Sequence, residues 1–215
     1  KIDKALEKPA YKPLGRGEGS PAGGPVAPPG NYQVQMKTGT AEITHSFEIT
    51  KDPRLKTSAK DFALQFELWS KITNRVSATN SAINKVRKIN LQITELLGRE
   101  IFTRAAPEKS LTAVRKAAKS LMNKLSQIEN QLTQNQYETP SDRLRHPTML
   151  KQRMEALVSV VSISDAAPPQ QAYEVYEDLS SKIDDQLALL SKLEKQDLPR
   201  VNKLIELAGI PKLQA

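Results

Sequence analysis

The sequence contains two histidines, His45 and His146, and no cysteine, so very few side chains could bind a metal ion or transfer a proton near neutral pH. Neither histidine has a second histidine or a cysteine at the i, i+4 spacing of a helical metal site. His146 stands directly before Pro147 and is expected to make a loop contact, whereas His45 is expected to face solvent or a neighbouring strand. The sequence therefore predicts no metal site and no cofactor.

Carboxylates and serines are common, but none stands in the pattern of a known type of catalytic site. A di-metal site in a helical bundle needs Glu-x-x-His pairs, and a serine nucleophile on a sharp turn needs Gly-x-Ser-x-Gly; neither pattern occurs. The glycines between residues 15 and 24 precede no switch from strand to helix, as a phosphate-binding loop would require. We therefore predict no catalytic residue and no enzyme activity. A group of acidic residues is interpreted as a solvated helix face: Glu174, Glu177, Asp178, Asp184 and Asp185.

Six apolar side chains are candidates for docking or packing contacts. Phe62, Phe66 and Trp69 follow one another at helical spacing near the start of a long predicted helix. They form either a docking site or the packing joint between that helix and a preceding hairpin. The other three candidates belong to the hairpin itself: Tyr32, Val34 and Phe47.

The charge of the chain alone would suit an acidic partner, because the formal net charge is +8 and the isoelectric point is near 9.6. The 32 Lys and Arg residues are, however, interleaved with 24 Asp and Glu residues, and no run resembles a basic arm. A mixed, solvated surface is the preferred interpretation, and no nucleic-acid partner is expected. No apolar run approaches the roughly 20 residues that a helix needs to span a bilayer, so no transmembrane segment is predicted.

The first fifty residues divide into two parts. Residues 1–30 are rich in Pro and Gly and cannot bury enough apolar surface to form a core, which predicts an extended segment. Residues 31–50 alternate apolar and polar side chains on both sides of a turn at Thr38 and Gly39, which predicts a β-hairpin. Two strands are marginal alone in water, and no other convincing strand occurs in the sequence. The hairpin is therefore expected to complete a sheet of another polypeptide or of a part of the protein outside this chain.

One long helix dominates the rest of the sequence. Between Ser58 and about Leu97, apolar residues recur three, four or seven positions apart for about 60 Å of helix. Thr57 or Ser58 can cap the start, with Asp61 at the positive end of the helix, and Gly98 marks the far end. The predicted apolar stripe comprises Phe62, Phe66, Trp69, Ile72, Val76, Ile83, Val86, Ile93 and Leu97. Several later helices, or another chain, must cover a stripe of this length.

Four further helices are predicted in the second half of the chain. The connection at 101–106 leads to a helix that begins at Pro107 and repeats apolar residues regularly up to Leu132. A polar loop at 135–147, with a helical turn after Ser141, precedes a third helix at 148–164. A fourth helix follows Pro168 and Pro169, and a short last one starts near Pro199 and stops at Gly209.

Together these elements predict a mainly α protein. Its domains are a Pro/Gly-rich extended segment at 1–30, a β-hairpin at 31–50, and an elongated antiparallel helical bundle at 56–215. The bundle comprises about four long helices and a short last one.

Several short sequence segments resemble segments of a known protein family. They are Pro-Ala-Gly-Gly-Pro-Val-Ala-Pro-Pro-Gly-Asn-Tyr-Gln-Val at 21–34, Lys-Asp-Pro-Arg-Leu at 51–55, Asp-Leu-Pro-Arg-Val-Asn-Lys-Leu at 197–204, and the closing Ala-Gly-Ile-Pro. From Ser20 onward, these segments and the order of elements resemble the C-terminal region of exported bacterial proteins with sialidase-like (BNR-repeat) β-propellers. Such proteins are often labelled glycosyl hydrolase or sortilin-type propeller proteins.

The resemblance implies that a propeller and an immunoglobulin-like or fibronectin-like sheet precede the helices, and that the hairpin supplies the last two strands of this sheet. The propeller signature Ser-x-Asp-x-Gly-x-Thr-Trp is absent, so any glycosidase-type site would lie outside these residues. The implied partners are that upstream polypeptide or other subunits of an assembly, including a membrane-associated one. The implied location is periplasmic, extracellular or at the cell surface of a bacterium.

Two functions are consistent with these observations. The first is a non-catalytic scaffold or protein-interaction module of an exported propeller protein or larger assembly. The second is a free-standing helical adaptor that binds partner helices or acidic polymers through its basic faces, which predicts binding that weakens steeply with salt.

Overall fold

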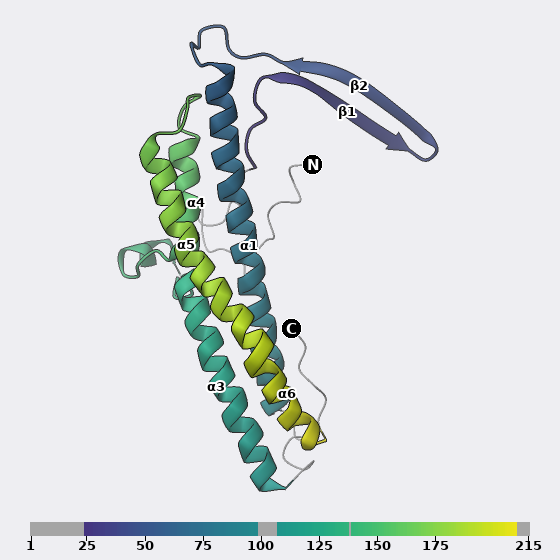
Figure 1. Cartoon of the computed structure of the whole chain (residues 1–215), viewed down its shortest axis with the longest axis vertical. Helices are drawn as coiled ribbons and strands as arrows, with labels where there is room; N and C mark the ends of the chain where they lie inside the picture. The colour runs from purple at the N-terminus through teal and green to yellow at the C-terminus, as the bar shows by residue number, and fades with distance from the viewer. Residues whose placement is uncertain (1–23, 99–106, 138, 210–215) are drawn as a thin grey trace.

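The chain forms an elongated helical bundle from which a two-stranded hairpin projects near one end (Figure 1). The computed structural model describes residues 24–98, 107–137 and 139–209. The prediction of a mainly helical fold preceded by a β-hairpin is confirmed. The elements are β1 (Gly30–Thr38), β2 (Ala41–Ile49), α1 (Ala59–Gly98), α3 (Glu108–Leu132), α4 (Leu150–Val161), α5 (Gln170–Lys192) and α6 (Leu198–Leu207). Most of the predicted extended segment at 1–30, and the predicted connection at 101–106, lie outside the described residues.

Helix α1 has 40 residues and runs most of the length of the bundle, with α4 beside its first half and α3 beside its second half (Figure 1). Helix α5 contacts α1, α3 and α4. The predicted stripe on α1 is therefore too narrow. Leu68, Ile89 and Leu96 are also buried, whereas Phe66, Trp69 and Leu97 are only half-buried. A helix that packs against three neighbours buries more than one stripe.

The start of α1 is fixed by a reciprocal capping arrangement between Ser58 and Asp61. The Asp61 backbone N–H donates to Ser58 Oγ at 3.2 Å, and the Ser58 backbone N–H donates to Asp61 Oδ2 at 3.2 Å. The Ser58 hydroxyl also donates to Asp61 Oδ2 at 2.7 Å, and these bonds hold the pKa of Asp61 below its usual value. Two N–H groups that lack partners inside the helix are thereby satisfied, which confirms the predicted cap.

Helix α3 follows its predicted repeat closely. It begins one residue after Pro107, and the apolar residues of the repeat are buried: Leu111, Val114, Ala118, Leu121, Leu125, Ile128 and Leu132. On the side towards α1, Glu129 Oε1 forms an ion pair with Arg87 Nε at 2.5 Å. This helix therefore packs along the second half of α1, as its period predicts.

Helix α4 is shorter than the sequence predicts, since it ends at Val161 and not at Ser164. Its last turns contain Val160 and Val161, and β-branched residues of this kind favour the helix only weakly. Gln65 of α1 stabilises this end, because its buried Nε2 donates to the carbonyl oxygens of Val161 and Ser164, both at 2.7 Å. The polar side chain on α1 thus terminates α4.

Helices α5 and α6 form a single rod, in which a π-turn at Leu193–Asp197 joins the two α-helices. The Leu198 N–H donates to the carbonyl oxygen of Leu193, five residues earlier, instead of four. Pro199, in the first turn of α6, has no N–H, and in an α-helix its ring would clash with the carbonyl of Lys195. The π-turn avoids this clash and lets the rod continue. At the far end, Gly209 has a φ of 70°, so the predicted glycine stop of α6 is confirmed.

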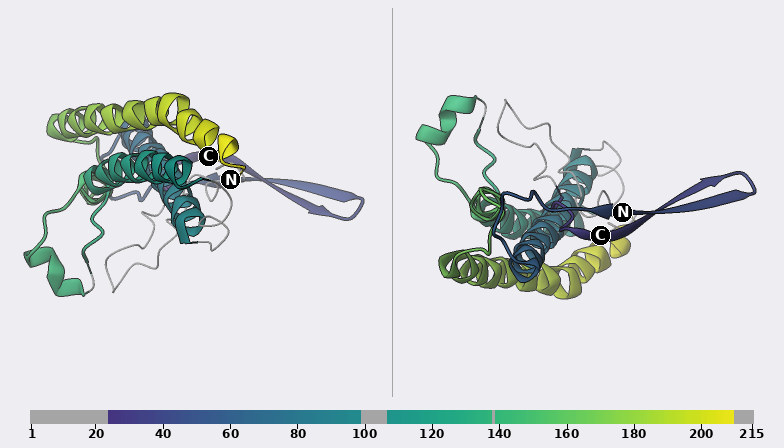
Figure 2. Two further views of the ribbon diagram at one scale, coloured as in Figure 1. Left: turned by 90° about the horizontal axis from the view of Figure 1, so that it is seen from below. Right: turned by 90° about the horizontal axis from the view of Figure 1, so that it is seen from above.

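The polar loop between α3 and α4 projects from the bundle and contains the predicted helical turn, a short 3-10 helix at Pro140–Leu144 (Figure 2). His146 makes the expected loop contact. The Tyr137 hydroxyl donates to the His146 carbonyl oxygen at 3.3 Å, and the two rings lie 6.5 Å apart.

Candidate interaction surfaces

The register of the hairpin places its large apolar side chains on one face. The strands are antiparallel, and the turn contains Gly39, with a φ of 56°, and Thr40, one residue later than predicted. Side chains of directly paired residues share a face of a sheet. Tyr32 pairs with Phe47, Val34 with His45, and Met36 with Ile43. These residues form what we call the apolar face of the hairpin.

The opposite, polar face of the hairpin consists of residues whose side chains bond to one another across the strands. It comprises Asn31, Gln33, Gln35 and Lys37 on β1 with Glu42, Thr44, Ser46 and Glu48 on β2. Lys37 pairs with Glu42 at 3.1 Å, Gln35 donates to the same carboxylate, and Gln33 donates to Ser46 at 3.4 Å. This face is suited to contact with water.

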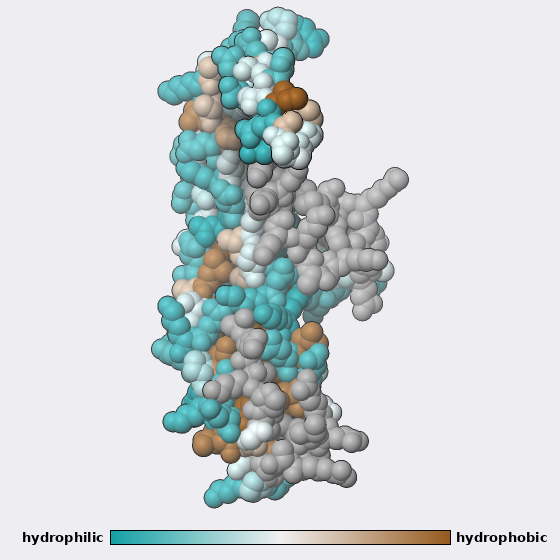
Figure 3. Space-filling view, turned by 90° about the vertical axis from the view of Figure 1, so that its right-hand side faces the viewer, coloured by the Kyte–Doolittle hydropathy of each residue, from teal (hydrophilic) through white to brown (hydrophobic). Residues whose placement is uncertain are grey.

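No element of the described chain covers the apolar face. Val34 and Met36 are each 54% exposed, Ile43 57% and Phe47 44%. The rings of Tyr32 and Phe47 stack at 5.9 Å, and among the described residues no strand residue comes within 8 Å of a helix residue between Cα atoms. Apolar side chains accordingly lie at the surface where the hairpin faces the viewer (Figure 3).

The six candidate residues fall into two separate groups. Tyr32, Val34 and Phe47 lie together on the apolar face of the hairpin. On α1, Phe62 is buried, while Phe66 and Trp69 are half-buried. The strands make no contact with α1, so the three α1 residues are not a joint between the hairpin and the bundle. The segment at 24–29 runs alongside the first half of α1 in both views (Figures 1 and 2).

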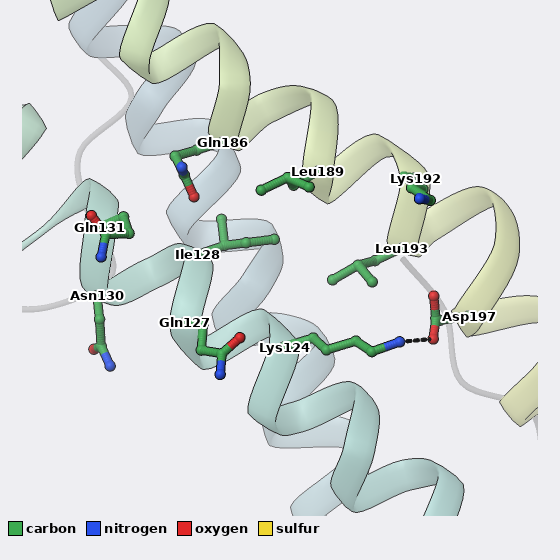
Figure 4. Close-up of a pocket in the computed structure, with 10 residues that line it drawn as sticks. All are labelled: Lys124, Gln127, Ile128, Asn130, Gln131, Gln186, Leu189, Lys192, Leu193 and Asp197. Atoms are coloured by element: carbon green, nitrogen blue, oxygen red, sulfur yellow. Dashed lines mark hydrogen bonds and ion pairs between the residues drawn. The ribbon is translucent and has the colours of Figure 1, made fainter.

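A second surface is a groove of ≈ 650 Å³ between α3 and the end of α5 (Figure 4). Its apolar part is formed by Ile128, Leu189 and Leu193, and Leu189 is 49% exposed. Side-chain amides line its sides, and the ion pair between Lys124 Nζ and Asp197 Oδ1, at 2.6 Å, crosses one end. The apolar repeat of α5 buries Leu190 and Leu193 but does not include Leu189. An apolar residue outside the repeat is the one feature of the sequence that points to the groove.

Charges are distributed unequally between the two helices that border this groove. Helix α3 carries five basic and two acidic residues, which gives +3, whereas α5 carries five acidic and two basic residues, which gives −3. Of the α5 carboxylates, Asp178 pairs with Lys182 at 2.7 Å and Asp184 with Arg75 at 2.5 Å. Of the two helices that border the groove, α3 is therefore the basic one and α5 the acidic one.

Two other kinds of site are absent from the part of the chain that the structure describes. No group of three or more His, Cys, Asp or Glu side chains is placed to hold a metal ion. No helix combines the length and the apolar composition needed to cross a membrane. His45 lies on the apolar face of the hairpin, opposite Val34, and is exposed.

Comparison with protein-family models, with curated proteins and with solved structures gives no match.

Proposed function

We propose that this chain is a non-catalytic scaffold and protein-interaction module, and that the hairpin is its contact with another polypeptide. The main support is the apolar face of the hairpin, which none of the described helices covers although its residues match the pattern of a half-buried sheet. Exposed apolar patches of this kind commonly mark interaction sites. The opposite face is polar and suits the solvated side of an antiparallel sheet.

The bundle supports the same proposal by giving the hairpin a rigid base. Helix α1 packs against three other helices, and ion pairs join separate elements: Lys85 with Glu194 at 2.9 Å and Lys124 with Asp197 at 2.6 Å. A long rod with a projecting hairpin can join two bodies. This geometry suits a scaffold.

The resemblance described above supports a more specific form of the proposal. In this form the hairpin completes the immunoglobulin-like or fibronectin-like sheet of an exported bacterial propeller protein, or docks on another subunit of its assembly. Any glycosidase-type activity would then belong to the propeller.

The absence of cysteine from the sequence allows a direct test by single-cysteine labelling. Met36→Cys places a thiol on the apolar face, and Gln35→Cys places one on the polar face of the same strand. In the isolated chain both thiols should react with a maleimide at similar rates. In the complex purified from the source, native mass spectrometry should show a second polypeptide, and Cys at position 36 should react at least about tenfold more slowly than Cys at position 35. A single polypeptide with two equally reactive thiols would refute the proposal.

A helical adaptor is the second candidate function, and the groove between α3 and α5 favours it. A partner helix could lie over Ile128, Leu189 and Leu193, in the helix-in-groove mode. Acidic polymers could instead bind the basic residues of α3. Leu189→Lys should abolish binding of a partner helix, whereas polymer binding should weaken steeply with salt and tolerate this change. Isothermal titration with the material that co-purifies would separate these outcomes.

A further inference from the structure

The two outer edges of the hairpin expose complete rows of backbone hydrogen-bonding groups. The turn holds two residues, so the pair that flanks it, Thr38 and Ala41, exchanges both of its hydrogen bonds, and every second pair does the same. The residues between these pairs direct their N–H and C=O groups outwards. They are the eight residues of the polar face, four on each strand. Neither strand contains a proline or a bulge, which are common means of protecting an edge.

The two edges differ in position and in charge. In Figure 1, β2 forms the side of the ribbon that faces away from the bundle, and β1 forms the side nearer to it. On β1 the only charged outward residue is Lys37, which is paired with Glu42. On β2, Glu42 and Glu48 stand at the two ends of the row, with Thr44 and Ser46 between them. The Glu48 carboxylate forms no hydrogen bond or ion pair with another of the described residues.

These acidic residues disfavour pairing of the β2 edge with a second copy of the chain. If two β2 strands paired antiparallel over their whole length, with His45 opposite His45, Glu42 of each copy would lie directly opposite Glu48 of the other. Like charges in this position are destabilising, and this register contains two such pairs. A strand with Lys or Arg at the same positions would instead be attracted.

We infer that the β2 edge pairs with an edge strand of a different polypeptide, and that this strand carries basic side chains opposite Glu42 and Glu48. The inference rests on the proposed function and specifies how the partner binds. The added strand would extend the row of Ile43, His45 and Phe47 with apolar side chains of its own. The apolar face would then be covered by a second layer of the partner.

Hydrogen exchange of the complex purified from the source tests this inference. The amides of Thr44 and Ser46 point outwards on β2, and those of Gln33 and Gln35 point outwards on β1, so the second pair is a matched control. In the isolated chain all four should exchange rapidly. In the complex, the exchange of Thr44 and Ser46 should slow by at least about 100-fold, with Gln33 and Gln35 unchanged.

The possible outcomes separate this inference from the proposed function. If the β1 amides slow instead, or if no outward amide slows while the thiol at position 36 is shielded, the edge pairing is refuted and the scaffold proposal stands. If no partner is present and that thiol stays reactive, the scaffold proposal itself fails.

The charge on β2 can be tested on the isolated chain. Glu42→Gln with Glu48→Gln removes the repulsion between two β2 edges, so self-association measured by sedimentation velocity should strengthen at least about fivefold. Glu95→Gln with Glu177→Gln, which removes two exposed carboxylates on the helices, is the control and should leave self-association unchanged. Equal association of all three chains would show that these carboxylates do not protect the edge, and it would remove the argument for a basic partner strand.

Discussion

Individual polar side chains determine where the helices of this bundle begin and end. Ser58 and Asp61 form the start of α1, and Gln65, one turn later, binds the end of α4. The cap was predictable because its residue types and spacing are local. The contact of Gln65 was not, because its partners lie 96 and 99 residues away and a glutamine on a helix gives no signal of a buried acceptor.

The cap predicts a pH-dependent effect on stability. Ser58→Ala should lower the free energy of unfolding at neutral pH by about 1 kcal/mol. Bonds from Ser58 lower the pKa of Asp61, so the stabilisation by its carboxylate is complete above the usual aspartate value of 3.8 and is lost as the pH falls through the lowered value. In urea unfolding experiments, the difference between the two proteins should therefore be smaller at a pH well below 3.8 than at neutral pH. Ser120→Ala, at an exposed site on α3, is the control; an equal effect at both pH values would contradict the role of the carboxylate.

Replacing Gln65 should lower the free energy of unfolding more than replacing Ser58. Gln65→Ala leaves the carbonyl oxygens of Val161 and Ser164 without this donor in a largely buried site, which should cost about 2 kcal/mol of unfolding free energy. Gln127→Ala, at an exposed position, removes a side chain of the same size and should change stability little. Denaturant unfolding followed by circular dichroism measures both. Similar stabilities for the two variants would mean that water replaces the Gln65 amide.

At the scale of elements, the sequence predicts helices well where each has a single buried face and less well where it does not. Helix α3 has one apolar repeat, and its boundaries and core agree with the prediction to within a residue. Helix α1 packs against three helices and buries Thr73, Thr79 and Asn80 among its apolar residues, so no single stripe describes it. The π-turn was not predicted, because Pro199 was compatible with a break as well as with a continuous rod. The hairpin residues were predicted, but the separation of the strands from Phe62, Phe66 and Trp69 depends on the path of the chain between residues 50 and 58.

The π-turn predicts which deletion the rod can tolerate. A π-turn adds one residue to the α-helical phase, so deleting the exposed Gln196 together with Pro199→Ala should give a continuous α-helix that keeps Val201 and Ile205 facing the core. The thermal midpoint should stay within about 5 °C of the parent protein. Deleting Ser181 from the middle of α5 is the control, since it rotates the rest of the rod by about 100° and should greatly reduce the midpoint. If both deletions were equally harmful, the extra residue would not be the reason for the π-turn.

At the scale of the whole molecule, the described strands of the hairpin lie apart from the helices of the bundle. Among the described residues the hydrophobic core lies in the helical bundle, and no helix residue approaches the strands within 8 Å between Cα atoms. The helices therefore bury their apolar side chains against one another, whereas the apolar face of the hairpin is exposed to solvent. The exposed apolar face of the hairpin is therefore what the proposed contact with another polypeptide would explain.

This separation predicts the result of removing the hairpin. Gly30 and Ile49 are directly paired, so a Gly-Gly turn can join Pro29 to Thr50 in place of residues 30–49 without moving α1. The thermal midpoint of the helices, followed by circular dichroism at 222 nm, should change by less than about 2 °C, because no buried contact of the bundle is lost. Trp69 fluorescence should also be unchanged, whereas assembly with the partner should be abolished. A large fall in the midpoint would show that the hairpin stabilises the bundle, and its apolar face would then need no partner to account for it.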